Sequence, residues 1–90
     1  MIGEKRVGPA APQILETDVD GEISLYNPTN ESVTILNGTA SDVWLLCDGG
    51  HSIEEIQDLL AASYGTTRES VSEDVERTIA EFHTAGLLEA

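Results

Sequence analysis

Apolar and polar residues alternate along the first third of the chain, which is the pattern of short β-strands. Between residues 13 and 19, apolar or β-branched residues alternate with acidic ones, as expected for a strand with two different faces. Asp20-Gly21 follows, and both residues tolerate positive φ, so the chain is predicted to turn back there. The returning strand is expected at 22–26, which completes a hairpin.

A third strand is predicted at Ser32–Leu36, a segment rich in β-branched residues that follows a second turn at 27–30. The three strands are expected to form an antiparallel meander, in which only the middle strand is paired on both sides. Because the third strand runs directly into a helix, one of its edges should keep unpaired backbone groups. Such an edge is either an aggregation hazard or a docking site for another peptide.

Three amphipathic helices are predicted after the strands, because apolar residues then recur at helical spacing. The expected caps are Asn37 or Thr39 for the first helix, Ser52 with Glu55 for the second, and Thr66 with Glu69 for the third, with glycines 49–50, Gly65 and Gly86 at the ends. The residues expected to face the core are Ala40, Val43, Trp44 and Cys47, then Ile53, Ile56, Leu59, Leu60 and Tyr64, then Val71, Val75, Ile79 and Phe82.

The order of these elements predicts one α+β domain of winged-helix-like architecture, with a three-stranded antiparallel sheet followed by a three-helix bundle. The domain is expected to span residues 13–90. Residues 1–12 contain two prolines, two glycines and no periodicity, so they are predicted to be a flexible tail.

Charge narrows the choice of partners. The chain has 17 acidic and 4 basic residues, a net charge of −13, which repels nucleic-acid phosphates and anionic membranes. This balance suits a basic partner, or serves solubility alone. Cys47 is the only cysteine, so no internal disulfide can form. With no signal-peptide pattern and no apolar run longer than Val43–Cys47, a cytoplasmic location is expected.

An ordered set of residues in the helical half resembles a known family. The set consists of Leu36-Asn37, Ala40, the run from Val43 to Gly49, the run from Ser52 to Ile56, Asp74-Val75, Ile79, Phe82 and Gly86-Leu87. These residues, with their spacing, resemble the PqqD-like family of small peptide chaperones. The same domain is known as a recognition element for ribosomally made, modified peptides. The resemblance extends over roughly Gln13 to Glu89.

The resemblance implies binding rather than catalysis, with no cofactor. Members of the family capture the leader segment of a precursor peptide as an extra strand beside the third strand. They then present the peptide to a modifying enzyme, such as a radical enzyme, or to the leader protease of lasso-peptide assembly. The implied partners are therefore a precursor peptide and one such enzyme.

The residues themselves point to the same edge, because the third helix is the element expected to flank the third strand. The candidate peptide-binding positions are Val33, Thr34 and Ile35 on the strand, and Asp74, Val75, Thr78, Ile79 and Phe82 on the helix. Val75, Ile79 and Phe82 could equally be plain core. Since a free edge can also pair with its own copy, both a monomer and an edge-paired dimer stay open.

The main alternative is an acidic carrier protein with a phosphopantetheine arm on Ser52, because residues 49–53 are similar to a carrier attachment motif. Against it, carriers are helical throughout and Ser52 is already explained as a helix cap. A DNA-binding winged helix is disfavoured by the acidic third helix. The sequence holds no catalytic constellation, and glycines 49–50 separate Cys47 from His51, which argues against a metal pair.

Overall fold

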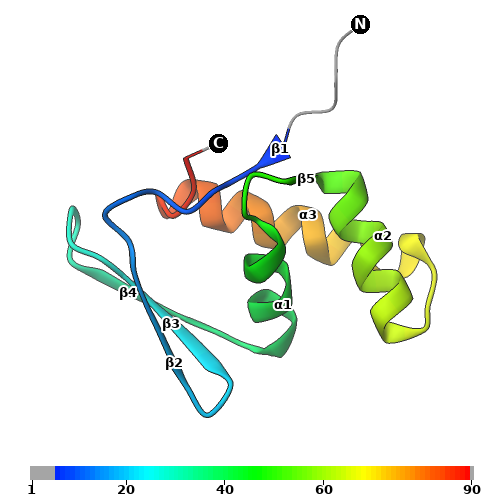
Figure 1. The fold of residues 1–90 in the computed structure, drawn as a ribbon, viewed down its shortest axis with the longest axis horizontal. Coiled ribbons are helices and arrows are strands. Elements are labelled where there is room, and N and C mark those ends of the chain that lie inside the picture. Colours follow the sequence, from blue (N-terminus) through cyan, green and yellow to red (C-terminus); the bar gives the residue numbers. More distant parts are fainter. Residues whose placement is uncertain (1–5, 90) are drawn as a thin grey trace, which may run out of the picture.

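The computed structural model describes residues 6–89 and has the predicted α+β class, with a three-stranded antiparallel sheet beside three helices (Figure 1). The elements are β1 (Arg6–Val7), β2 (Leu15–Val19), β3 (Glu22–Asn27), β4 (Ser32–Leu36), α1 (Gly38–Leu46), β5 (His51–Ser52), α2 (Ile53–Tyr64) and α3 (Arg68–Thr84). In Figure 1, α1 lies between the sheet and α2, and α3 passes behind α1.

The sheet is the predicted meander, with strand order β2-β3-β4. Asp20 and Gly21, which join β2 to β3, both have positive φ, 55° and 80°, and these values match the residue types expected at a tight hairpin. Across the sheet, Glu16 is paired with Leu25 and Leu25 with Thr34. Because paired residues share a face, these three side chains lie on the side of the helices.

The core lies between this inner face of the sheet and the helices. Its fully buried side chains are Leu25, Val43, Ile56, Val75, Ile79 and Leu87. The rings of Trp44 and Phe82 meet edge to face, with centroids 5.3 Å apart, an arrangement that aromatic quadrupoles favour. Trp44 and Cys47 are buried, as the helical stripe predicted.

The helix caps follow the sequence with one exception. Asn37 caps α1, and Ser52 and Glu55 form the expected capping box at α2. The third helix was expected to begin with a box at Thr66, which is wrong, since Thr67 is the cap. The amide of Thr66 still donates to the carbonyl of Ala61 and so belongs to the end of α2.

Two residues of α2 were expected in the core and are instead at the surface. Leu59 and Tyr64 are each 44% exposed. The buried face of α2 is centred on Ile56, Leu60 and Ala61, together with Gln57, whose amide donates to the Glu76 carboxylate on α3. Leu59 lies outside this buried face, on the solvent side of α2.

The end of α3 is closed as predicted. Gly86 has φ 72°, and the amide of Leu87 donates to the carbonyl of Phe82 at 3.0 Å. This pair of features is the Schellman arrangement, in which a glycine in the left-handed region satisfies the last helical carbonyls. It folds Leu87 back into the core.

The flexible tail expected over residues 1–12 is wrong for residues 6–12; residues 1–5 lie outside the described residues. β1 pairs with β5, and the carbonyl of Val7 accepts the amide of Gly49 at 2.8 Å. Further along, Ala11 donates to Leu87 and Glu89 donates to Pro9, each at 2.9 Å. The periodicity of the sequence could not predict this pairing, because each paired segment is only one or two residues long. Within residues 6–89, no helix has the length and apolar character needed to cross a membrane.

Candidate functional site

β4 is an edge strand of the sheet and has a free side. Within residues 6–89 it pairs only with β3. In an antiparallel edge strand, every second residue directs its N–H and C=O away from the neighbour, so five residues leave about four to six free groups. These free groups can form hydrogen bonds with another strand.

The other edge strand, β2, is protected by charge, whereas β4 is not. β2 carries Glu16 and Asp18 on the inner side of the sheet, and inward-pointing charges discourage pairing at an edge. The Glu16 carboxylate also accepts a hydrogen bond from the Trp44 indole at 2.7 Å. β4 has the sequence SVTIL and no charged residue. The two edge strands of the sheet therefore differ in charge, and β4 is the uncharged one.

The candidate residues of β4 fall on both faces of the sheet. Thr34 is half-buried on the inner face, next to the helices. Val33 and Ile35 are 63% and 64% exposed on the outer face, because successive side chains of a strand point to opposite sides. Their side chains are therefore not directed toward α3, although their backbone groups belong to the same edge.

The candidate residues of α3 also separate into two groups. Val75, Ile79 and Phe82 are almost completely buried, so we assign them to the core rather than to a peptide-contacting surface. They recur on the buried stripe of α3, which packs against α1 and α2. Asp74 is exposed and Thr78 is at the margin of this stripe, where both line a surface hollow.

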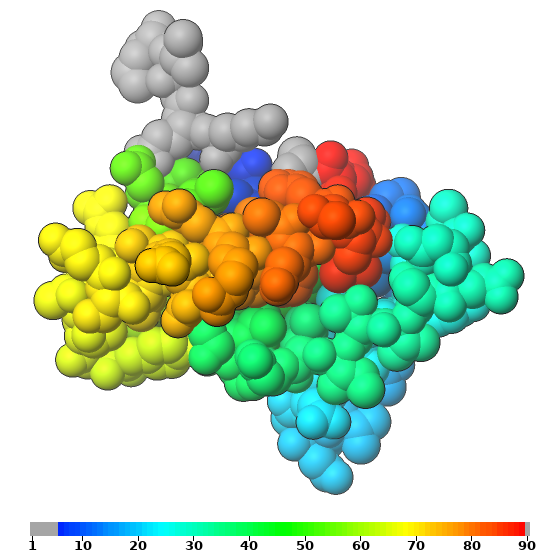
Figure 2. Space-filling model, turned by 180° about the vertical axis from the view of Figure 1, so that it is seen from behind, coloured from blue at the N-terminus to red at the C-terminus, as the bar shows by residue number. Residues whose placement is uncertain are grey.

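α3 runs antiparallel to β4, and we call the strip of surface between these two elements the furrow. At one end, the side-chain amide of Asn27 donates a hydrogen bond to the backbone carbonyl of Ala85, just after α3. Asn27 is the residue of β3 that pairs with Ser32, the first residue of β4. At the other end a hollow of about 340 Å³ separates the β4–α1 junction from α3. Its lining residues are Asn37, Thr39, Ala40, Asp74, Arg77, Thr78 and Glu81. Figure 2 shows α3, in yellow to orange, running beside the teal and green surface of β4 and α1.

The hollow is strongly polar. Arg77 donates from Nη2 to the Asp74 carboxylate at 2.9 Å, an exposed pair three residues apart on α3. Glu81 lies on the same side of the helix, one turn after Arg77. Glu81 was not among the predicted site residues. Its spacing of seven residues from Asp74 and three from Thr78, on one helical face, was the available indication.

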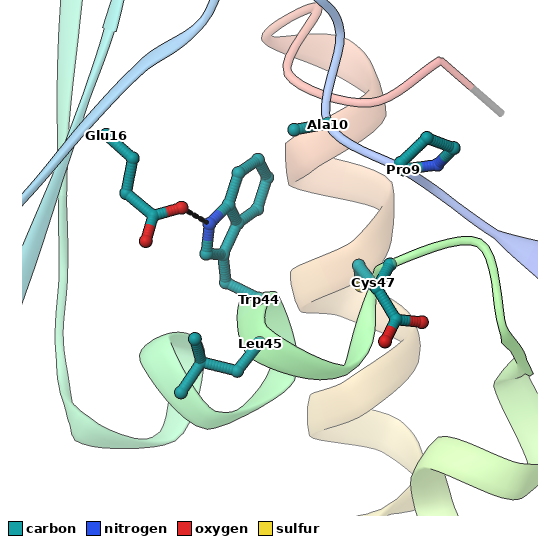
Figure 3. A pocket seen from close by; sticks show the side chains of 7 residues that line it. Pro9, Ala10, Glu16, Trp44, Leu45 and Cys47 are labelled. Carbon is teal, nitrogen blue, oxygen red and sulfur yellow. Dashed lines mark hydrogen bonds between the residues drawn. The ribbon is translucent and has the colours of Figure 1, made fainter.

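A second hollow, of about 200 Å³, lies at the opposite edge of the sheet, between β2, α1 and the N-terminal segment (Figure 3). Pro9, Ala10, Glu16, Trp44, Leu45, Cys47 and Asp48 line it. Burial, and secondly the charge of Asp48, raises the pKa of the Cys47 thiol to about 12. A thiol with so high a pKa is protonated at neutral pH, so it is a packing group and not a nucleophile.

Ser52 is held in a structural role. Only 4% of it is exposed, and its hydroxyl accepts the Glu55 amide at 3.2 Å, while the Glu55 carboxylate accepts the Ser52 amide at 2.9 Å. A serine that carries a prosthetic arm has to be accessible, and the sheet has no place in an all-helical carrier. The carrier interpretation is therefore not supported. In the described part of the chain, no three His, Cys, Asp or Glu residues gather as metal ligands.

Comparison with known proteins agrees with this geometry. Residues 22–88 match the family model described as coenzyme PQQ synthesis protein D. The chain belongs to the PqqD family. This confirms the predicted resemblance over β3, β4 and all three helices.

Two solved structures share the fold of this PqqD-family chain. One is TbiB1 in complex with the TbiA(beta) leader peptide, at 25% identity and a TM-score of 0.80, covering 90% of this chain and 94% of that chain. The other is a lasso peptide synthetase B1 complexed with the leader peptide, at 20% identity and a TM-score of 0.79, covering 91% and 96%. No curated protein gives a significant sequence match.

Proposed function

We propose that this PqqD-family protein is a non-catalytic binding protein for the leader segment of a ribosomal precursor peptide. The leader adds as a strand along the free edge of β4, in the furrow between β4 and α3. The observation that carries this proposal is the uncharged, unpaired edge of β4 beside α3. Support also comes from TbiB1, a protein of the same fold that is known in complex with a leader peptide.

Backbone pairing alone gives only weak binding. About four to six hydrogen bonds at roughly 1 kcal/mol each contribute about 4 to 6 kcal/mol, before the cost of ordering the peptide. This range corresponds to dissociation constants between about millimolar and tens of micromolar. Leader side chains that enter the furrow must therefore add affinity and provide sequence specificity. In an added strand, every second side chain points toward α3 and can do so.

The remaining leader side chains would emerge on the outer face of the sheet, which is unusually apolar. Leu15, Tyr26 and Val33 are paired across the three strands there, with Ile35 and Val19 nearby, and all five are exposed. An outer sheet face in water normally carries polar residues. We propose that the modifying enzyme or leader protease docks on this outer face, where it contacts the sheet and the leader together.

Strand addition is tested by a backbone N-methylation scan of the leader. The ligand is a synthetic peptide with the leader sequence of the precursor, which we expect to be encoded beside this chain's gene, and each non-proline residue is N-methylated in turn. Affinity is measured by isothermal titration calorimetry. Methylation should weaken binding about tenfold or more at every second position across β4, where the amide faces the strand, and much less at the positions between.

The unmethylated residues between the sensitive positions serve as internal controls, because the peptide composition hardly changes. A loss of affinity without this two-residue period would contradict strand addition. The same would follow if the sensitive positions recurred at helical spacing.

A further inference from the structure

Thr78 offers a polar group that has no partner within the described chain. It is only 8% exposed and lines the hollow between the β4–α1 junction and α3. Its hydroxyl forms no hydrogen bond with any residue from 6 to 89. No buried side-chain nitrogen or oxygen among residues 6–89 lacks a partner, so the unpaired Thr78 oxygen is accessible from the hollow. The side chain is therefore more than nine-tenths buried, while its oxygen is open to a group that enters the hollow.

The charges around Thr78 define which partner fits. Asp74 is paired with Arg77, whereas the Glu81 carboxylate has no ion pair or hydrogen bond among the described residues. Two carboxylates and one guanidinium leave the hollow with a formal charge of −1. The side chains of Asn37 and Thr39 add further oxygen atoms to its wall. The hollow thus presents a free carboxylate and a free hydroxyl to one incoming group.

We propose that this hollow accepts a lysine or arginine side chain of the leader peptide. The inference rests on the proposed function and specifies the chemistry that the site recognises. An inward-facing leader residue at the level of Leu36 and Asn37 directs its side chain into the hollow. Its charged nitrogen donates to the Glu81 carboxylate and to the Thr78 hydroxyl oxygen. Charge-assisted hydrogen bonds of this kind are stronger than neutral ones.

The size of the hollow suits a long side chain. Its volume of about 340 Å³ equals that of about ten water molecules at bulk density. The aliphatic stem of a lysine or arginine can pack along the wall at Ala40 while the charged end reaches the carboxylate. A short leader side chain would leave Glu81 and Thr78 as unpaired as they are in the free protein.

The test is a double-mutant cycle between the protein and the leader. The peptide is the leader of the precursor encoded beside this gene, with each lysine replaced in turn by norleucine and each arginine by citrulline. The proteins are the wild type, Glu81→Gln and Thr78→Val. At one basic position, neutralisation should weaken binding to the wild type about tenfold and leave binding to Glu81→Gln nearly unchanged. Thr78→Val should bind the unmodified leader about fivefold more weakly while unfolding at the same temperature or higher.

Glu73→Gln is the matched control, because this exposed carboxylate lies on α3 outside the hollow and its removal changes the net charge equally. It should bind every peptide as the wild type does. Equal effects of Glu73→Gln and Glu81→Gln would overturn the inference, since they would show general charge attraction. Tighter binding to Glu81→Gln would also overturn it, because Arg77 would then be receiving an acidic leader residue. Failure of the wild type to bind any leader would overturn the proposed function and this inference together.

Discussion

Replacing Phe82 by leucine separates a core role from a ligand-binding role. The sequence offered Phe82 as a peptide contact, whereas the structure buries it to 3% exposure, edge-on to Trp44. Leucine keeps an apolar side chain at the same depth, so the variant should fold. It removes the aromatic pair and leaves a small void against the indole ring.

The magnitude follows from these two losses. Truncating a buried phenylalanine to alanine costs about 3–5 kcal/mol, and leucine retains most of the buried carbon. The ring pair contributes about 0.5–1.5 kcal/mol beyond its buried area. Together with the void, the free energy of unfolding should fall by about 1.5–2 kcal/mol for Phe82→Leu. For a domain of this size, such a loss lowers the melting temperature by about 10 °C.

Two measurements on the Phe82→Leu variant distinguish a core role from a ligand-binding role. Urea unfolding followed by circular dichroism should show a midpoint lower by about 1.5–2 M, with an unchanged slope. Leader affinity, measured by calorimetry well below the melting temperature, should stay within twofold of the wild type. A variant of normal stability that bound the leader ten times more weakly would refute the assignment of Phe82 to the core.

Three further predictions address other parts of the molecule. Gly8→Ala should lower the free energy of unfolding by more than about 2 kcal/mol, because its Cβ would lie 2.1 Å from the Cys47 carbonyl oxygen; urea unfolding should show a smaller loss for Gly21→Ala, where only positive φ is at issue. The pKa of Cys47 is raised from 9.0 to about 12, chiefly by burial, so the thiol should react with Ellman's reagent at pH 8 only after unfolding. Because the folded state keeps a proton that the unfolded chain releases, stability should fall between about pH 9 and 12. Leu15→Thr with Val19→Thr should leave leader affinity unchanged and weaken association with the modifying enzyme or leader protease by at least tenfold in a pull-down titration.

Local chemistry explains why much of the fold was predictable. The turn at Asp20 and Gly21, the cap at Asn37 and the glycine at 86 each act over six residues or fewer. The turn and the glycine were placed correctly, and Asn37 was one of the two predicted caps. The pairing of β1 with β5 depends on residues more than 40 positions apart. Two-residue strands have no periodicity, so only the tertiary structure reveals that the segment around Val7 is part of the core.

The site was less predictable because a strand's sequence does not say which face is inside. In β4 the two apolar side chains Val33 and Ile35 would normally be assigned to the core, and Thr34 to solvent. The structure has them the other way round, since Thr34 is directly opposite Leu25 on the inner face. Register with β3 decides this, and a shift of one residue would reverse every side chain.

This inverted pattern is itself a reason to place function at β4. Sequence rules tend to fail where a protein keeps an unfavourable local arrangement for use in a complex. In the free chain, β4 exposes apolar Val33 and Ile35 to water and turns polar Thr34 toward the furrow. A leader strand would shield the furrow, and an enzyme on the outer face would shield the apolar pair. The two partners that the proposed function requires would then cover both faces of β4.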